Sequence, residues 1–99
     1  MQGEENPLEL AARRAVELGN ELAGQDQEAD LWDIADGLLA GAIHFWLYSR
    51  QPCGDAMCED CSPVATAELR MAELRRLIEE LATDSEYYHS PNDSNVGRA

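Results

Sequence analysis

The sequence predicts an all-α protein, a three-helix bundle in which a short helix packs on a long antiparallel helical hairpin with a cysteine-rich connecting loop. In three segments, apolar residues recur at alternating spacings of three and four, which is the period of one helix face. No segment alternates apolar and polar residues as a half-buried strand does. The chain has 99 residues. Two separate cores would each be too small to be stable, so we expect one domain over residues 1–99.

The first helix is expected at about residues 7–23. Asn6 is a typical N-cap, Pro7 suits the first helical position, and Glu9 stands three residues after the cap, as in a capping box. The apolar stripe consists of Leu8, Ala11, Ala15, Leu18 and Leu22. Because alanine side chains are short, this helix is expected to lie close to its neighbour. Gly24 is placed to end the helix.

The second helix is expected at about residues 30–49. From Leu38 to Tyr48 the segment is apolar on all sides apart from His44, a pattern typical of a helix that is covered on several sides. Two other helices of so short a chain leave part of this surface uncovered. We therefore expect Leu38–Tyr48 to bind a protein partner or a second copy of the chain, which would make the protein a dimer.

The third helix is expected at about residues 63–86, with Ser62 as its N-cap and Pro63 at its first position. Its apolar stripe consists of Val64, Ala67, Met71, Leu74, Ile78 and Leu81. Arg76 and Glu80 form an i,i+4 pair on the exposed side. After Ser85, a proline and a cluster of asparagine, aspartate and serine residues predict a flexible tail over residues 87–99.

The loop between the second and third helices, residues 50–62, contains every cysteine of the chain in a Cys-x4-Cys-x2-Cys pattern. The three cysteines are Cys53, Cys58 and Cys61. Two thiolates separated by two residues can bind one tetrahedral zinc ion at about 2.3 Å per Zn–S bond. Gly54 lets the backbone turn so that the third thiolate approaches from the other side. The pattern therefore predicts a zinc site.

The charge of this loop supports a bound cation. Asp55, Glu59 and Asp60 make the loop negative, and we expect them to keep metal-free thiols protonated. A divalent cation would offset that accumulation of negative charge. The fourth ligand is less clearly indicated by the sequence. His44 is the first candidate, because it lies about 9 Å along its helix from Arg50.

Other fourth ligands stay open at this point. His89 is a second candidate, but in an antiparallel hairpin it would lie roughly 30 Å away, at the other end of a long helix. A loop carboxylate or a water molecule are further candidates, and a water would leave an open coordination position.

The cysteines also allow three other interpretations. They can pack the loop as small apolar residues. Their spacing matches the first three ligands of a plant-type two-iron, two-sulfur cluster, but the distant fourth cysteine is absent, so an iron–sulfur cluster is the weaker alternative to zinc. The Cys58-x-x-Cys61 pair precedes a helix N-terminus, which favours thiol-redox chemistry, whereas the two acids inside the pair oppose it.

Net charge excludes several classes of partner. The chain has 20 acidic residues against 7 basic ones, a formal net charge of −13. Direct nucleic-acid binding is excluded, because such binding depends on cations that neutralise phosphates, and anionic membrane surfaces are disfavoured. No apolar run reaches the roughly 18 residues that a membrane span needs. The same acidity fits a charge-mimicking inhibitor of a nucleic-acid-binding protein.

These patterns together predict a small acidic helical interaction or accessory protein whose cysteine loop binds a structural metal. Glu4 and Glu5 occupy the N-terminal region, which lacks the pattern of a targeting signal, so we expect the protein to be cytoplasmic with reduced cysteines. No catalytic residue is predicted, because no triad on a rigid scaffold and no phosphate-binding glycine loop is present. The alternatives are the charge-mimicking inhibitor and a small thiol-redox or metal-dependent enzyme.

Overall fold

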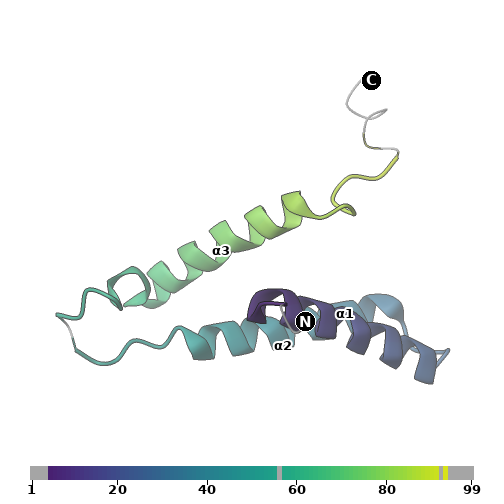
Figure 1. Ribbon diagram of the computed structural model, residues 1–99, viewed down its shortest axis with the longest axis horizontal. Coiled ribbons are helices and arrows are strands. Elements are labelled where there is room, and N and C mark those ends of the chain that lie inside the picture. Colours follow the sequence, from purple (N-terminus) through teal and green to yellow (C-terminus); the bar gives the residue numbers. More distant parts are fainter. Residues whose placement is uncertain (1–4, 56, 92, 94–99) are drawn as a thin grey trace. The chain divides into compact units, whose positions relative to one another are not determined.

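The computed structural model describes residues 5–55, 57–91 and 93, and this part of the chain is all-α, as the sequence predicts. It contains three α-helices and one short 3-10 helix, and no strand (Figure 1). The elements in chain order are α1 (Pro7–Gln25), α2 (Leu31–Ser49), η1 (Ser62–Val64) and α3 (Ala67–Asp84). No helix in these described ranges is both long enough and apolar enough to cross a membrane.

The chain divides into two compact units, Met1–Ser49 and Arg50–Ala99, called here the N-terminal and the C-terminal unit. The N-terminal unit contains α1 and α2. The C-terminal unit contains the cysteine loop, η1 and α3. The packing of the third helix on the other two, and a single domain over residues 1–99, stay predictions.

The start of α1 follows the predicted cap. Asn6 has an extended backbone conformation, and its Oδ1 accepts a hydrogen bond of 2.8 Å from the backbone N–H of Glu9. This bond satisfies one of the amide groups that lack a partner in the first turn of a helix. The predicted end at Gly24 is wrong, because α1 continues to Gln25 and Asp26 is the C-cap. Gly24 keeps the helical backbone and does not adopt the left-handed conformation of a glycine cap.

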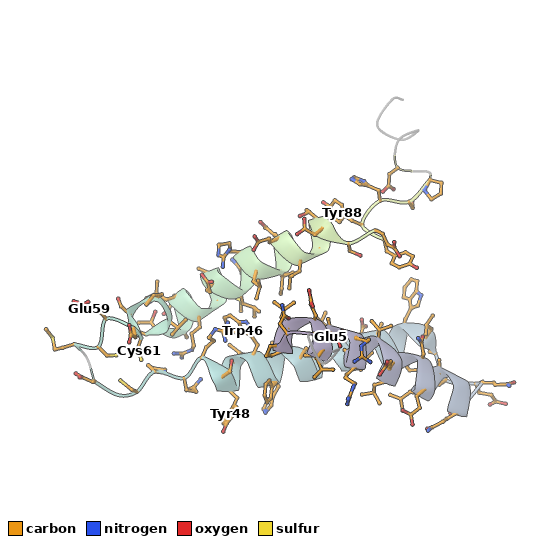
Figure 2. All side chains as sticks on the ribbon, viewed as in Figure 1. Glu5, Trp46, Tyr48, Glu59, Cys61 and Tyr88 are labelled. Atoms are coloured by element: carbon orange, nitrogen blue, oxygen red, sulfur yellow. The ribbon has the colours of Figure 1, made fainter. Side chains whose placement is uncertain are left out.

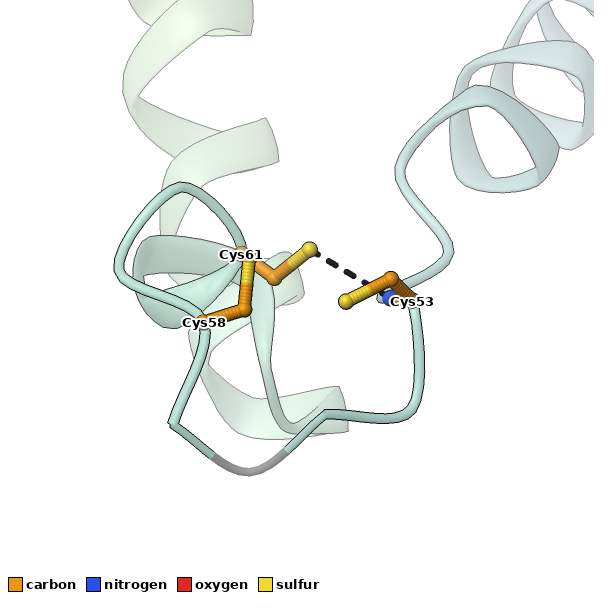
Figure 3. Close-up of side chains that lie close together, drawn as sticks. All are labelled: Cys53, Cys58 and Cys61. Atoms are coloured by element: carbon orange, nitrogen blue, oxygen red, sulfur yellow. Dashed lines mark hydrogen bonds between the residues drawn. The ribbon is translucent and has the colours of Figure 1, made fainter.

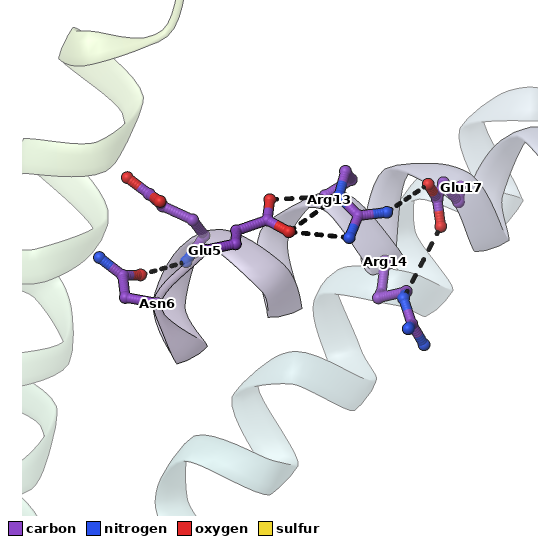
Figure 4. A network of polar contacts seen from close by, with 6 residues as sticks. Glu5, Asn6, Arg13, Arg14 and Glu17 are labelled. Carbon is purple, nitrogen blue, oxygen red and sulfur yellow. Dashed lines mark hydrogen bonds and ion pairs between the residues drawn. The ribbon is translucent and has the colours of Figure 1, made fainter. Parts of the chain in front are cut away.

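An exposed ion-pair network also lies along the start of α1 (Figure 4). Arg13 contacts a carboxylate oxygen of Glu5 at 2.8 Å and one of Glu17 at 2.8 Å. Arg14 lies 4.0 Å from the other oxygen of Glu17. Because these side chains are exposed to solvent, the network contributes little to stability.

The helical hairpin of the structure is formed by α1 and α2. A short connection links them, in which the N–H of Ala29 donates to the carbonyl of Asp26. A Cβ atom built on Gly19 would lie 3.0 Å from Cδ1 of Leu38, so the two helices approach closely there. This close approach is at Gly19, outside the predicted apolar stripe, so the role predicted for the alanines of the stripe stays a prediction.

The apolar surface of α2 is largely exposed. Leu39 is 54% exposed, Phe45 69% and Tyr48 71%, and Tyr48 projects away from α2 in Figure 2. In the described residues, only Leu74 of α3 is buried. The Leu38–Tyr48 segment was expected to be covered on several sides, and within the N-terminal unit α1 leaves these three side chains exposed.

The third helix begins later than predicted. Ser62 and Pro63 open η1, and α3 starts at Ala67 with Thr66 as its N-cap. The Oγ1 of Thr66 accepts a 3.1 Å hydrogen bond from the N–H of Leu69. The segment contains two capping residues four positions apart, and the second one starts the longer helix. Sequence reasoning chose the first because a proline follows it.

The guanidinium group of Arg70 connects η1 to α3 by donating to the carbonyl of Val64 at 3.0 Å. Along the exposed side of α3, Arg76 pairs with Glu73 at 2.6 Å and with Glu80 at 3.3 Å, and the second pair is the predicted one. The helix ends at Asp84, before the predicted residue 86.

The predicted flexible tail, residues 87–99, falls in part outside the described residues. Within the described part, the N–H of Tyr88 donates to the carbonyl of Ser85, and the N–H of Ser90 donates to a carboxylate oxygen of Asp93. These short-range bonds form turns after α3 and continue no helix.

Candidate metal centre

Two turns bring the three cysteines of the C-terminal unit together. In the first turn, the carboxylate of Asp55 accepts a 2.9 Å hydrogen bond from the N–H of Met57, and the carbonyl of Asp55 accepts one of 3.0 Å from the N–H of Cys58. Gly54 has a φ of +94°, a conformation that side-chain-bearing residues rarely adopt. The structure confirms that the backbone turns at Gly54.

The second turn leads from the Cys58-x-x-Cys61 pair into η1. The N–H of Ser62 donates to the carbonyl of Glu59 at 3.3 Å, and the N–H of Val64 donates to that of Cys61 at 3.0 Å. These bonds curl the chain so that both cysteine side chains of the pair lie on the same side of the turn. Cys53 approaches the other two cysteines from the opposite side of the loop (Figure 3).

The three Sγ atoms all lie within 4.8 Å of one another. Three thiolates of a tetrahedral zinc site, each about 2.3 Å from the ion, lie about 3.8 Å apart. Shifts of about 1 Å or less therefore convert the observed cluster into a zinc-binding geometry. All three cysteines are free thiols. Cys53 is exposed, and Cys58 and Cys61 are half-buried.

Backbone N–H groups surround these sulfur atoms. The N–H of Cys53 donates to Sγ of Cys61 at 3.3 Å. The pKa of Cys58 is lowered, first by a hydrogen bond from the backbone N–H of Cys61, then by the thiols of Cys61 and Cys53, with a smaller contribution from the N–H of Asp60. Hydrogen bonds of this kind stabilise a thiolate. The prediction that metal-free thiols stay largely protonated considered the loop acids and not these nearer amide groups.

The pKa of Cys61 moves the other way. The strongest influence on Cys61, the N–H of Cys53, lowers its pKa, but the thiols of Cys53 and Cys58 together with burial outweigh that bond and raise it. In a cluster of three neighbouring thiols, each negative charge makes the next one harder to form. A divalent cation removes this conflict, because it favours the thiolate form of all three cysteines.

Of the two predicted histidine ligands, only His89 lies in the same unit as the cluster, and it does not join the cluster. No histidine or carboxylate of the described residues belongs to the group formed by the three cysteines. His89 is exposed, and its Nδ1 lies 3.7 Å from a carboxylate oxygen of Asp93. His44 belongs to α2 of the N-terminal unit, and its role as fourth ligand stays a prediction.

A pocket that sequence reasoning missed lies beside the cluster. Its volume is about 330 Å³, and the residues that line it include Pro52, Asp55, Cys58, Cys61, Ser62 and Ala65. Ala65 lies four residues after Cys61, outside the cysteine pattern, and it lines the pocket because η1 turns the chain between them. The one sequence signal for this turn was Ser62-Pro63, which we interpreted as the start of the long helix.

The chain matches no family model, no curated protein and no solved structure. Its function is therefore argued from the chemistry of the cluster. Three thiolates form a soft donor set, which suits Zn²⁺, Cu⁺ and iron–sulfur clusters better than Mg²⁺ or Ca²⁺.

Proposed function

We propose that this protein is a small acidic helical interaction or accessory protein whose cysteine loop binds zinc as a structural metal. The observation that carries the proposal is the approach of the three Sγ atoms to within 4.8 Å of one another in one loop. Cys53, Cys58 and Cys61 would be three ligands, and His44 is the first candidate for the fourth. Zinc fits this set because it accepts thiolate and imidazole ligands in tetrahedral geometry.

Zinc would stabilise the cysteine loop. The described residues of the loop are exposed or half-buried, and its backbone-to-backbone hydrogen bonds form short-range turns, with the bond from Cys53 N–H to Sγ of Cys61 crossing the loop. Binding of a structural zinc ion to such a segment is coupled to its folding, so the ion would order the chain between Cys53 and the start of η1. Chemistry at the metal is not needed for this role.

The apolar residues of α2 support an interaction role. Large apolar side chains of this helix that are more than half exposed are Leu31, Trp32, Leu39, Phe45 and Tyr48. Exposed apolar side chains in this number are typical of a surface that binds another protein. The partner is either a second copy of the chain or a different protein. Mimicry of nucleic-acid charge stays a prediction from the net charge of −13.

The metal content of protein purified without added metal tests the proposal. We expect one zinc ion per chain by elemental analysis. Removal of a residue that only hydrogen-bonds to a metal ligand already weakens metal binding by about 10–100-fold. Each single substitution Cys53→Ser, Cys58→Ser or Cys61→Ser removes a ligand itself and should therefore weaken zinc binding by at least about 100-fold. Met57→Leu is the matched control, because Met57 lies in the same loop and is 85% exposed. Metal-free protein that binds no added zinc would refute the proposal.

Thiol-redox chemistry is the second candidate, favoured by the proximity of Cys58 and Cys61 in a Cys-x-x-Cys pair. In that reaction the two thiols would lose two electrons and two protons to a hydroperoxide and form a disulfide. The hydroperoxide would be reduced to an alcohol and one water molecule, or to two water molecules if it is hydrogen peroxide. Thiol titration before and after peroxide treatment distinguishes the candidates. Rapid, reversible loss of exactly two thiols in zinc-loaded protein supports the redox role, whereas protection by zinc supports the structural one.

A further inference from the structure

We infer that the cysteine site takes a neutral imidazole as its fourth ligand, seated in the pocket beside Cys58 and Cys61, in preference to an anionic ligand. This inference rests on the proposed zinc site and goes beyond it by naming the chemical class of the external donor. The imidazole would belong to a histidine outside the C-terminal unit, either His44 of the same chain or a histidine of a partner protein.

The first argument is the number of ligands. Within the described residues, the cluster consists of three thiol groups and no fourth histidine, cysteine or carboxylate. Zinc bound by proteins is almost always four-coordinate. The fourth position must therefore be filled by water or by a donor that reaches the ion from outside the cluster.

The second argument is the space available. The pocket is lined by two of the three candidate ligands, Cys58 and Cys61, so a group inside it lies next to the position that the ion would occupy. Its volume of about 330 Å³ corresponds to about ten water molecules. An imidazole ring with its attached methylene group occupies less volume than this.

The third argument is charge. Zinc with three thiolates carries a net negative charge, and an anionic fourth ligand would add to it. Asp55 lines the pocket, and Glu59 and Asp60 stand between Cys58 and Cys61 in the chain. A carboxylate about 8 Å from the metal lowers the affinity for an anionic ligand by a factor of about two to six in a well-solvated site. A neutral nitrogen donor avoids this repulsion.

Cobalt replaces zinc as a spectroscopic probe in the test. Co²⁺-loaded full-length protein would be titrated with imidazole, azide and thiocyanate above the pKa of imidazole, and the visible d–d bands would report ligand exchange. The titrations would use the wild type, His44→Ala and, as a matched control, His89→Ala. We expect imidazole to bind at least about tenfold more tightly than either anion, given three nearby carboxylates.

Two variants probe the charge and the pocket separately. The combined change Asp55→Asn, Glu59→Gln, Asp60→Asn keeps the oxygen at position 55 that accepts from Met57, and should narrow the preference for imidazole over azide to about threefold or less. Ala65→Leu fills the pocket from an exposed position. It should weaken imidazole binding at least about tenfold, while cobalt still binds through the three thiolates.

The outcomes separate the two proposals. Imidazole binding only in His44→Ala identifies His44 as the natural donor, and equal binding in all three proteins shows that the position is open to an imidazole from outside the chain; both support the inference. Cobalt that binds tightly but whose bands respond equally to azide and imidazole, or to neither in any of the proteins, overturns the inference and leaves the zinc site intact. Failure of cobalt and zinc to bind overturns the proposed function itself.

Discussion

Replacement of Gly54 by alanine isolates the backbone contribution to metal binding. A Cβ atom at this position meets no other atom within 4 Å, so the substitution introduces no steric contact. Its effect is conformational, because Gly54 has a φ of +94°. A non-glycine residue in the left-handed region costs about 1–2 kcal/mol. A metal-free loop can relax to avoid this strain, whereas a loop closed on zinc must keep the turn, so the cost appears as weaker binding.

Since about 1.4 kcal/mol corresponds to tenfold in affinity, Gly54→Ala should weaken zinc binding by about 5- to 30-fold. Competition with a chromophoric chelator of known affinity measures the change. Gly54→Asn should recover part of the loss, because asparagine enters the left-handed region more readily than alanine. Gly41→Ala is the control, since Gly41 is helical, has open space around it and lies outside the loop. Equal zinc affinity in Gly54→Ala and the wild type would refute the reasoning.

Further substitutions test the helices and the thiols. Gly24→Ala should stabilise the protein by up to about 0.8 kcal/mol in thermal unfolding, because Gly24 is helical and unobstructed but lies at the end of α1. Gly19→Ala should stabilise the protein less than Gly24→Ala or destabilise it, because the new methyl group would lie 3.0 Å from Leu38 Cδ1. A larger gain in stability for Gly19→Ala than for Gly24→Ala would contradict the α1–α2 contact. Thr66→Ala should reduce stability by about 1 kcal/mol through loss of the α3 cap, whereas Thr66→Ser should not. In metal-free protein, the lowered pKa of Cys58 keeps its thiolate populated at lower pH. Iodoacetamide should therefore modify Cys58 before Cys61 as the pH rises, and mass mapping that finds Cys61 modified before Cys58 would contradict this assignment.

The cysteine cluster could be predicted because it is local. Cys53, Cys58 and Cys61 lie within nine consecutive residues, and a glycine next to the first of them supplies the reversal that a closed loop needs. The pocket beside them could not be predicted, because it depends on a 3-10 turn that places Ala65 next to the loop. The amide groups that lower the pKa of Cys58 are likewise a product of exact backbone geometry, which residue types alone do not specify.

The sequence by itself determined the helices and the cap of α1. Apolar spacing of three and four and the Asn6-Pro7 signal are properties of neighbouring residues, and they act through hydrogen bonds that close within one turn. Tertiary structure alone decided how closely α1 approaches α2 at Gly19. That outcome depends on contact between segments distant in the chain, where the interaction free energy is a property of the two segments together.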